Sequence, residues 1–311
     1  MVDSNACIAW RLFHLNWIPI ALMGGILLFG VALYGFSFEP VAAAIPIAIA
    51  VALALIAYVY AFAKADRADP KLIFSLGAIS QLLFVATIMG PLTYVAGTAN
   101  WPLQDHALLA IDRALGMDPE WIASYVNDHD WLGGLLLRGY GLIKWMLLLT
   151  PIVLSLTLIV TVAISTFIPA IGTYYGLNIE PSQFPTVDAS MYKAQLRDIL
   201  ALRDGSLRYL EMFKLAGIVS FPSFHAASAV LYLWALWPVR GVGIITTALN
   251  LLMIAATPVI GAHYMIDVIG GVALAAICIV LCKYVMKTVA LSSSSTAQAG
   301  QPSATLVPAL D

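Results

Sequence analysis

The sequence has few charged residues. Only 10% of its 311 residues are Asp, Glu, Lys or Arg, whereas a soluble globular protein carries about 25%. Hydrophobic residues make up 61% of the chain. They form uninterrupted runs of about 20 residues, which is the length that an α-helix needs to cross a bilayer. The composition therefore excludes an ordinary soluble domain and predicts an integral membrane protein.

An excess of positive charge is also missing. The chain has 15 Lys and Arg residues against 17 Asp and Glu residues, a net charge of −2. Nucleic-acid binding, or a polybasic patch on a lipid surface, would require a cationic excess. We therefore expect no nucleic-acid partner.

Cysteine is scarce. Three residues, Cys7, Cys278 and Cys282, are too few for a disulfide framework. Cys278 and Cys282 can share one helix face at a spacing of four residues, but no His or acidic residue stands nearby to complete a metal site. We interpret both as small membrane hydrophobes, and we predict no metal and no cofactor for this chain.

The apolar runs predict an all-α fold, a polytopic bundle of about six to eight transmembrane helices. Residues 1–16 are interpreted as a cytoplasmic segment before an uncleaved signal anchor, and residues 17–290 as one membrane domain whose functional core covers about 172–287. Residues 291–311 are of low complexity and are predicted to be a disordered tail. The predicted spans are 17–38, 41–63, 72–96, one or two crossings within 131–170, 221–237, 242–260 and 265–285.

Two long polar stretches interrupt the apolar runs. Residues 96–131 are polar and aromatic, which indicates helix and loop lying at the lipid head groups. Residues 172–217 contain equal numbers of basic and acidic side chains, which indicates a folded segment outside the membrane.

Basic residues in short loops predict the orientation of the bundle. The cluster at 64–71, Arg240, and the pair Lys283 and Lys287 should be cytoplasmic, because short loops rich in Lys and Arg stay on that side. Counting helices from Arg240 places Pro222 and His263 on the extracytoplasmic face. The count from Lys71 agrees only if residues 131–170 cross twice.

The first cluster of potentially catalytic residues is the sequence Ser220-Phe221-Pro222-Ser223-Phe224-His225. It places Ser223 and His225 in the first turn of an apolar helix, with Pro222 at the start. Free backbone N–H groups and the helix dipole favour an anion such as phosphate at this end of a helix.

The second cluster is His263-Tyr264-Met265-Ile266-Asp267, followed by Gly270 and Gly271. A His and an Asp four residues apart share one helix face, so the carboxylate can fix the imidazole tautomer and leave the other ring nitrogen as a nucleophile or base. The two glycines are predicted to allow close helix packing behind Asp267.

The spacing between the clusters predicts a single site. His225 and His263 are separated by one helix, a turn at Arg240-Gly241 and a second helix that returns, so both should lie at the same membrane face. Two histidines, a carboxylate and a helix N-terminus at one depth predict a phosphoryl-transfer centre.

These clusters resemble the second and third signatures of the type 2 phosphatidic acid phosphatase (PAP2) superfamily. The resemblance implies that His263 is the nucleophile that forms a phosphohistidine, His225 the general acid, Asp267 the partner that orients His263, and Ser223 a phosphate ligand. The substrate it implies is a lipid phosphate or phospholipid. The sequences Phe221–Ala227 and His263–Asp267 further resemble the branch that contains inositol phosphorylceramide synthases.

Two parts of the family pattern are missing. The chain contains no Arg-Pro dipeptide, which ends the usual first signature, and it has Ala256-Thr257 where the third signature has Ser-Arg. A phosphate dianion still requires positive charge. The nearest cations before Pro222 are Arg203, Arg208 and Lys214, and we favour Arg203 as a phosphate ligand.

Other functions remain open at this point. His225, His263 and Asp267 match a facial two-His, one-carboxylate metal site, so a metal-dependent hydrolase is one alternative. A lipid transporter without catalytic activity is another, although it predicts internal repeats that the sequence does not show. The motifs do not decide between a hydrolase and a transferase, and the sequence gives no indication of the oligomeric state.

Overall fold

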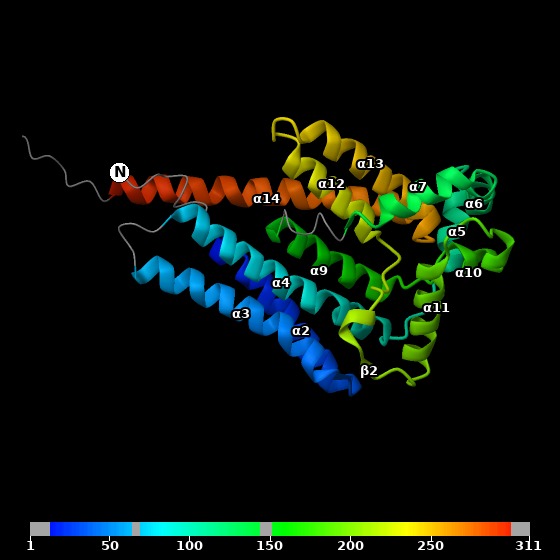
Figure 1. Cartoon of the computed structure of the whole chain (residues 1–311), viewed down its shortest axis with the longest axis horizontal. Helices are drawn as coiled ribbons and strands as arrows, with labels where there is room; N and C mark the ends of the chain where they lie inside the picture. Colours follow the sequence, from blue (N-terminus) through cyan, green and yellow to red (C-terminus); the bar gives the residue numbers. More distant parts are fainter. Residues whose placement is uncertain (1–12, 64–68, 144–150, 300–311) are drawn as a thin grey trace, which may run out of the picture.

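The computed structural model describes residues 13–63, 69–143 and 151–299. Within these ranges the chain is helical, as its composition predicts, and the long helices run side by side in one bundle (Figure 1). Five helices are long and apolar enough to cross a membrane. They are α2 (Trp17–Tyr34), α3 (Pro40–Ala63), α4 (Pro70–Gly97), α13 (Gly243–Ile260) and α14 (Met265–Ala299).

Two shorter apolar helices, α9 (Pro151–Phe167) and α12 (Phe224–Leu236), complete the bundle. The described residues thus contain five helices long enough to span a membrane and two shorter apolar helices, whereas six to eight spans were predicted. The bundle also exposes large apolar side chains, for example Leu28 and Phe29 on α2 and Ile244 on α13. Such a surface suits hydrocarbon as its solvent, and this fold is that of an integral membrane protein.

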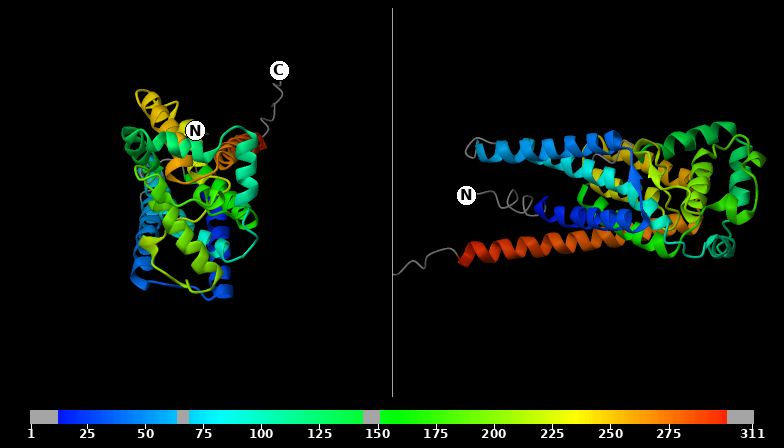
Figure 2. Two further views of the ribbon diagram at one scale, coloured as in Figure 1. Left: turned by 90° about the vertical axis from the view of Figure 1, so that its right-hand side faces the viewer. Right: turned by 90° about the horizontal axis from the view of Figure 1, so that it is seen from below.

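Short elements gather at one end of the bundle and form an end layer (Figures 1 and 2). This layer is built from the two polar stretches of the sequence and from α7, which follows the first of them. It contains α5 (Asp105–Ala114), α6 (Pro119–Asn127), α7 (Asp130–Tyr140), α10 (Thr173–Leu177), η2 (Pro181–Gln183), α11 (Ser190–Arg203) and η3 (Met212–Lys214). A two-stranded parallel sheet, β1 (Ser37–Phe38) with β2 (Tyr209–Leu210), ties the end layer to the connection between α2 and α3.

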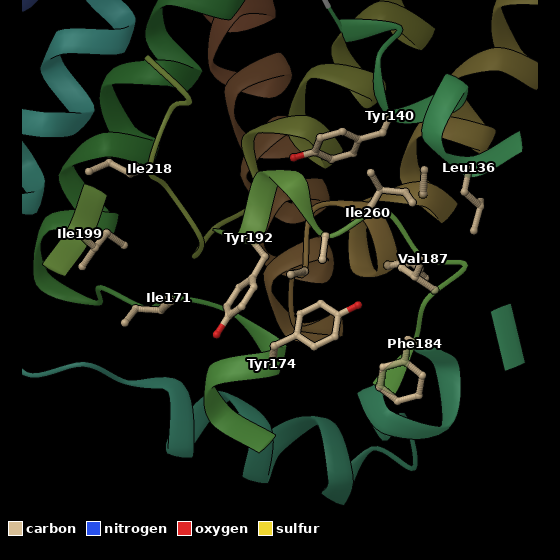
Figure 3. Close-up of a cluster of buried hydrophobic side chains, with 14 of the residues drawn as sticks. Leu136, Tyr140, Ile171, Tyr174, Phe184, Val187, Tyr192, Ile199, Ile218 and Ile260 are labelled. Carbon is tan, nitrogen blue, oxygen red and sulfur yellow. The ribbon is translucent and has the colours of Figure 1, made fainter. Parts of the chain in front are cut away.

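A buried cluster joins the end layer to the helix ends below it. Tyr174 and Tyr192 from the end layer pack with Ile260 at the end of α13, and Tyr94 near the end of α4 belongs to the same cluster. Figure 3 shows this cluster, including Tyr140 of α7. The end layer is therefore held to the bundle by a shared apolar core.

The directions of the helices place the predicted cytoplasmic residues away from the end layer. The start of α4, the turn between α12 and α13 and the C-terminal half of α14 lie toward the opposite end of the bundle (Figure 1). These segments carry Lys71, Arg240 and Lys283. The structure thus groups these residues on one side, as the sequence predicts, although it contains no membrane.

The stretch 131–170 differs from the prediction of two helices of about 20 residues. Its described part contains α9 and, except for Asp130, the whole of α7, a helix of 11 residues. At 1.5 Å per residue α7 is about 16 Å long, too short for a hydrocarbon core of about 30 Å. Both ends of the stretch nevertheless lie at the end layer, since Ala170 packs with Leu108 and Tyr264. Residues 144–150 lie outside the described residues.

The C-terminal boundary also differs from the prediction. The last span was expected to end at residue 285 and the disordered tail to begin at 291, whereas α14 continues to Ala299. Helix-forming Ala residues and the absence of Pro or Gly before residue 300 allow this continuation. Residues 300–311, and most of the predicted cytoplasmic segment 1–16, lie outside the described residues.

Candidate active site

The site begins at the N-terminus of α12. Ser223 is the N-cap of this helix, and its buried side chain accepts a hydrogen bond from the backbone N–H of Ala226 at 3.4 Å. The backbone N–H of Ser223 donates to the carbonyl oxygen of Asp267 at 2.9 Å. The start of α12 is therefore attached directly to the first turn of α14.

His263 and Asp267 interact as their spacing predicts. Nδ1 of His263 lies 3.1 Å from Oδ2 of Asp267, and both side chains are buried. Because a carboxylate only accepts hydrogen bonds, this contact places a proton on Nδ1 and leaves Nε2 with its lone pair free. His263 is thus prepared to act as a nucleophile or a base.

His225 lies beside this pair. The ring centroids of His225 and His263 are 6.5 Å apart, and the ring planes are inclined by 56°. The two helices that return the chain from one His to the other bring them together, as the sequence predicts. A phosphoryl group between the two rings would have a nucleophile on one side and a proton donor on the other.

Two residues at the site were missed by the sequence analysis. Ser220 donates a hydrogen bond from Oγ to Oδ2 of Asp267 at 2.7 Å. Tyr140 stacks on the ring of His225, with 3.9 Å between centroids and an angle of 13° between planes. Tyr140 comes from α7, which is 85 residues earlier in the chain, so no local pattern indicates this contact.

Asp267 is the centre of the hydrogen-bond network. Besides Ser220 and His263, its Oδ2 accepts the backbone N–H of Tyr264 at 3.1 Å. Its other oxygen, Oδ1, is buried and has no hydrogen-bond partner within the described parts of the chain. A buried carboxylate needs hydrogen-bond donors to replace water, so Ser220 and Tyr264 support Asp267 in its contact with His263.

The two glycines behind Asp267 allow α12 and α14 to approach closely, which confirms their predicted role. A Cβ atom on Gly271 would lie 2.2 Å from the carbonyl oxygen of Ser223, and one on Gly270 would lie 2.9 Å from the ring of Phe221. Any larger residue at position 271 would separate the helix of His225 from the helix of Asp267.

Two further carboxylates hold the site from the end layer. Oδ2 and Oδ1 of Asp112 accept the backbone N–H groups of Met265 and Ile266 at 2.6 and 2.8 Å, which caps α14. Asp105 accepts the N–H of Gly172 at 2.8 Å and a hydrogen bond from the hydroxyl of Tyr264 at 3.0 Å. Burial raises the pKa of Asp105, and it raises the pKa of Asp112 to about 6.

His263 lines a small pocket between α6 and the end of α13. Ile122 and Ala123 of α6 form one wall of this pocket, and Pro258 and Val259 of α13 form another. The nucleophile candidate is therefore covered by the end layer, in a place shielded from bulk water.

The predicted phosphate-binding cations are engaged elsewhere in the structure. Arg203 donates to the carbonyl oxygen of Trp101. Arg208 donates to the carbonyl oxygens of Leu202 and Leu207 and lies 5.3 Å above the ring of Phe36. Lys214 forms an ion pair with Glu211 at 2.6 Å. Over the described residues no hydrogen bond or ion pair connects these three side chains with either histidine, so their role in binding phosphate stays a prediction.

The geometry gives little support to a metal centre. Within the described ranges no group of three or more His, Cys, Asp or Glu side chains is placed to hold a metal ion. His263 uses Nδ1 for Asp267, and Oδ2 of Asp267 is already occupied by three donors. These contacts use Nδ1 of His263 and Oδ2 of Asp267, while Oδ1 of Asp267 has no hydrogen-bond partner within the described residues.

Comparison with protein families identifies the chain. A family model described as PAP2 superfamily matches residues 106–281, which is more than half of the sequence. The chain belongs to the PAP2 superfamily. The PAP2 match contains His225, His263 and Asp267 and begins within α5, so α2, α3 and α4 lie outside it. Comparisons with curated proteins and with solved structures give no significant match.

Proposed function

We propose that this PAP2 superfamily member is an integral-membrane phosphatase or phosphotransferase that acts on a lipid phosphate or a phospholipid head group. One observation carries the proposal. Asp267 orients the imidazole of His263 through Nδ1, and the ring of His225 stands beside it at a helix N-terminus.

In the proposed reaction Nε2 of His263 attacks phosphorus, so a P–N bond forms as the P–O bond to the lipid breaks. His225 donates a proton to the leaving oxygen, and Asp267 stabilises the imidazolium that develops on His263. In the second step His225 takes a proton from the incoming water or alcohol, whose oxygen attacks phosphorus and releases His263. Water gives hydrolysis, and an alcohol gives transfer.

We propose that two groups of donors stabilise the negative charge of the phosphate. The first is the N-terminal turn of α12 with Ser223, where backbone N–H groups and the helix dipole favour an anion. The second is a cation, for which we retain Arg203 as the first candidate, followed by Arg208 and Lys214. Engagement of Arg203 would require it to leave the carbonyl oxygen of Trp101.

The acceptor defines the finer activity. The resemblance of residues 221–227 and 263–267 to the inositol phosphorylceramide synthase branch favours transfer that involves an inositol-type head group. Hydrolysis of a lipid phosphate is the alternative. Both activities use the same phosphohistidine.

The test is release of inorganic phosphate from a panel of lipid phosphates, with and without added alcohol acceptors, by the purified full-length protein. His263→Ala should lower turnover by several orders of magnitude, and labelled phosphate should be trapped on His263 in an acid-labile form. His106→Ala is the matched control, since His106 is exposed and lies outside both motifs. Substantial activity in His263→Ala would contradict the proposal.

The role of His225 can be tested separately through the leaving group. An activated aryl phosphate needs little protonation, so His225→Ala should reduce its turnover far less than that of an alkyl lipid phosphate. Tyr140→Leu, which removes the stacked ring, should reproduce a weaker form of this pattern, whereas Tyr140→Phe should not. Equal losses for both substrates would assign His225 a binding or structural role.

A further inference from the structure

Three neighbouring helices of the described residues form a groove that has no part in the site described above. It lies between α2, α3 and α4 and has a volume of about 320 Å³. Its walls are apolar: Leu28 comes from α2, Ala43 and Ile47 from α3, and Ile88 and Pro91 from α4. Met212 of η3 closes it at the end layer. We call this cavity the acyl groove.

A second cavity of about 340 Å³ lies in the end layer, and its walls combine four charged side chains with Leu207, Leu210 and Leu215. Arg197 and Asp198 come from α11, and Tyr94 comes from α4. Lys214 is the last residue of η3, and Glu211 directly precedes this helix. We call this cavity the head-group pocket. Each cavity has the size of a typical small-molecule site.

The two cavities follow one another along the same face of α4. Phe84, Ile88 and Pro91 line the acyl groove, and Tyr94 lines the head-group pocket. These positions recur at three- and four-residue steps, so they form one stripe of the helix. The short helix η3 stands between the cavities, with Met212 in the groove and Lys214 in the pocket. An elongated ligand along α4 would meet apolar walls first and charged walls at the end layer.

The charges of the head-group pocket select the ligand. Arg197 pairs with Asp198 at 2.7 Å, and Lys214 pairs with Glu211 at 2.6 Å. Both cations are more than two-thirds exposed. The Lys214–Glu211 pair is exposed on both sides and contributes little stability, so a ligand that supplies both charges can exchange with it. Asp198 is buried, and it keeps the hydroxyl of Tyr94 as a donor when the exposed guanidinium of Arg197 turns to a ligand. A phosphate suits the two cations, and a primary ammonium, which has three donors, suits the two carboxylates.

We infer that the acyl groove and the head-group pocket together bind one phospholipid, with a fatty chain along α4 and a head group that carries a phosphate and a primary ammonium. Neither cavity is lined by His225, His263 or Asp267. The acyl groove is built largely from α2, α3 and α4, which lie outside the PAP2 match. This lipid site is therefore additional to the two histidines and Asp267. Of its residues only Lys214 is also a candidate cation of the proposed active site, and the crosslinking test below does not depend on catalytic activity.

The test uses the full-length protein in phosphatidylcholine vesicles that contain a trace of phosphatidylethanolamine with a photoreactive group in its acyl chain. Crosslinks are mapped by mass spectrometry, and we expect them at Leu28, Ile47 and Ile88. Unlabelled phosphatidylethanolamine should suppress these crosslinks, and phosphatidylglycerol at the same mole fraction should not. Equal suppression by both lipids would overturn the assignment of a zwitterionic head group.

Matched variants separate the two cavities. Arg197→Gln combined with Lys214→Gln should reduce crosslinking on the order of tenfold, whereas Lys193→Gln, an exposed cation on the same helix, should not. Ala43→Trp should block the acyl groove, and Ala44→Trp, at the exposed neighbouring position, is its control. Crosslinking that is unchanged in both the double variant and Ala43→Trp would show only unspecific contact with the bilayer and would overturn the inference.

Discussion

The hydroxyl of Ser220 donates a hydrogen bond to Oδ2 of Asp267 at 2.7 Å, on the same oxygen that contacts Nδ1 of His263. Ser220 is 2% exposed and Asp267 0%. Donors to a buried carboxylate keep it ionised and fix its rotamer. Ser220 is therefore expected to be a positioning residue that acts on His263 through Asp267.

Ser220→Ala should lower kcat about 10- to 100-fold, because a hydrogen bond to a charged group contributes roughly 1.5–3 kcal/mol. KM should change little, since Ser220 is expected to touch Asp267 and not the substrate. Steady-state kinetics with a lipid phosphate measure both constants. Ser228→Ala is the control, because Ser228 is equally buried and donates to the carbonyl oxygen of Phe224 instead. Unchanged kcat in a folded Ser220→Ala protein would rule out the positioning role.

Gly271→Ala should destabilise the protein and lower its activity together. The added Cβ atom would lie 2.2 Å from the carbonyl oxygen of Ser223, so α12 must move away from α14. Overpacking of this kind costs about 1–3 kcal/mol. The melting temperature in detergent should fall by several degrees. Gly25→Ala in α2 meets no atom within 4 Å and should leave the melting temperature unchanged or raised. Equal melting temperatures for the two variants would contradict the close packing.

The stability of the protein should fall as the pH rises through about 6. Burial raises the pKa of Asp112 from 3.8 to about 6, so the folded state binds the proton more tightly than the unfolded state does. Stability from this group is present at pH 4 and is lost between pH 4 and 7. The melting temperature should drop by a few degrees over this interval. Asp112→Asn should reduce the change of melting temperature with pH. If the melting temperature of this variant changes with pH as much as that of the unmodified protein, groups other than Asp112 cause the change.

The sequence was sufficient for the parts of the site that depend on local spacing. His263 and Asp267 are four residues apart at the start of α14, and the length of the α12–α13 hairpin brings His263 back to the end of the bundle where His225 lies. Apolar runs long enough to span a membrane also predicted the helices α2, α3, α4 and α13. These features are fixed by helix geometry, so a pattern in the sequence is enough to find them.

The contacts that the sequence could not indicate are long-range. Ser220 reaches Asp267, Tyr140 reaches His225, and Asp112 caps α14, each across 47 or more residues. Such partners are selected by the packing of the end layer on the bundle, which leaves no periodic signal. For the same reason Arg208, although near the motif in sequence, lies over the ring of the distant Phe36. Lys214 pairs instead with a local partner, Glu211, three residues earlier.

The last prediction concerns the face of the membrane on which the site lies. The segments that carry Lys71, Arg240 and Lys283 share one side of the bundle, opposite the end layer, and short loops rich in Lys and Arg remain cytoplasmic. We therefore expect His225 and His263 on the extracytoplasmic face.

Single cysteines and a membrane-impermeant thiol reagent on intact cells can test this orientation, in a background without Cys7, Cys278 and Cys282. Ser190, exposed at the start of α11, reports on the end layer. Val239, which is 45% exposed, reports on the opposite turn; Gly241 is unsuitable because its φ of 79° disfavours any side chain. Labelling of Ser190→Cys with protection of Val239→Cys is the expected result. The reverse pattern would place the chemistry in the cytoplasm and restrict the substrate to lipids of the inner leaflet.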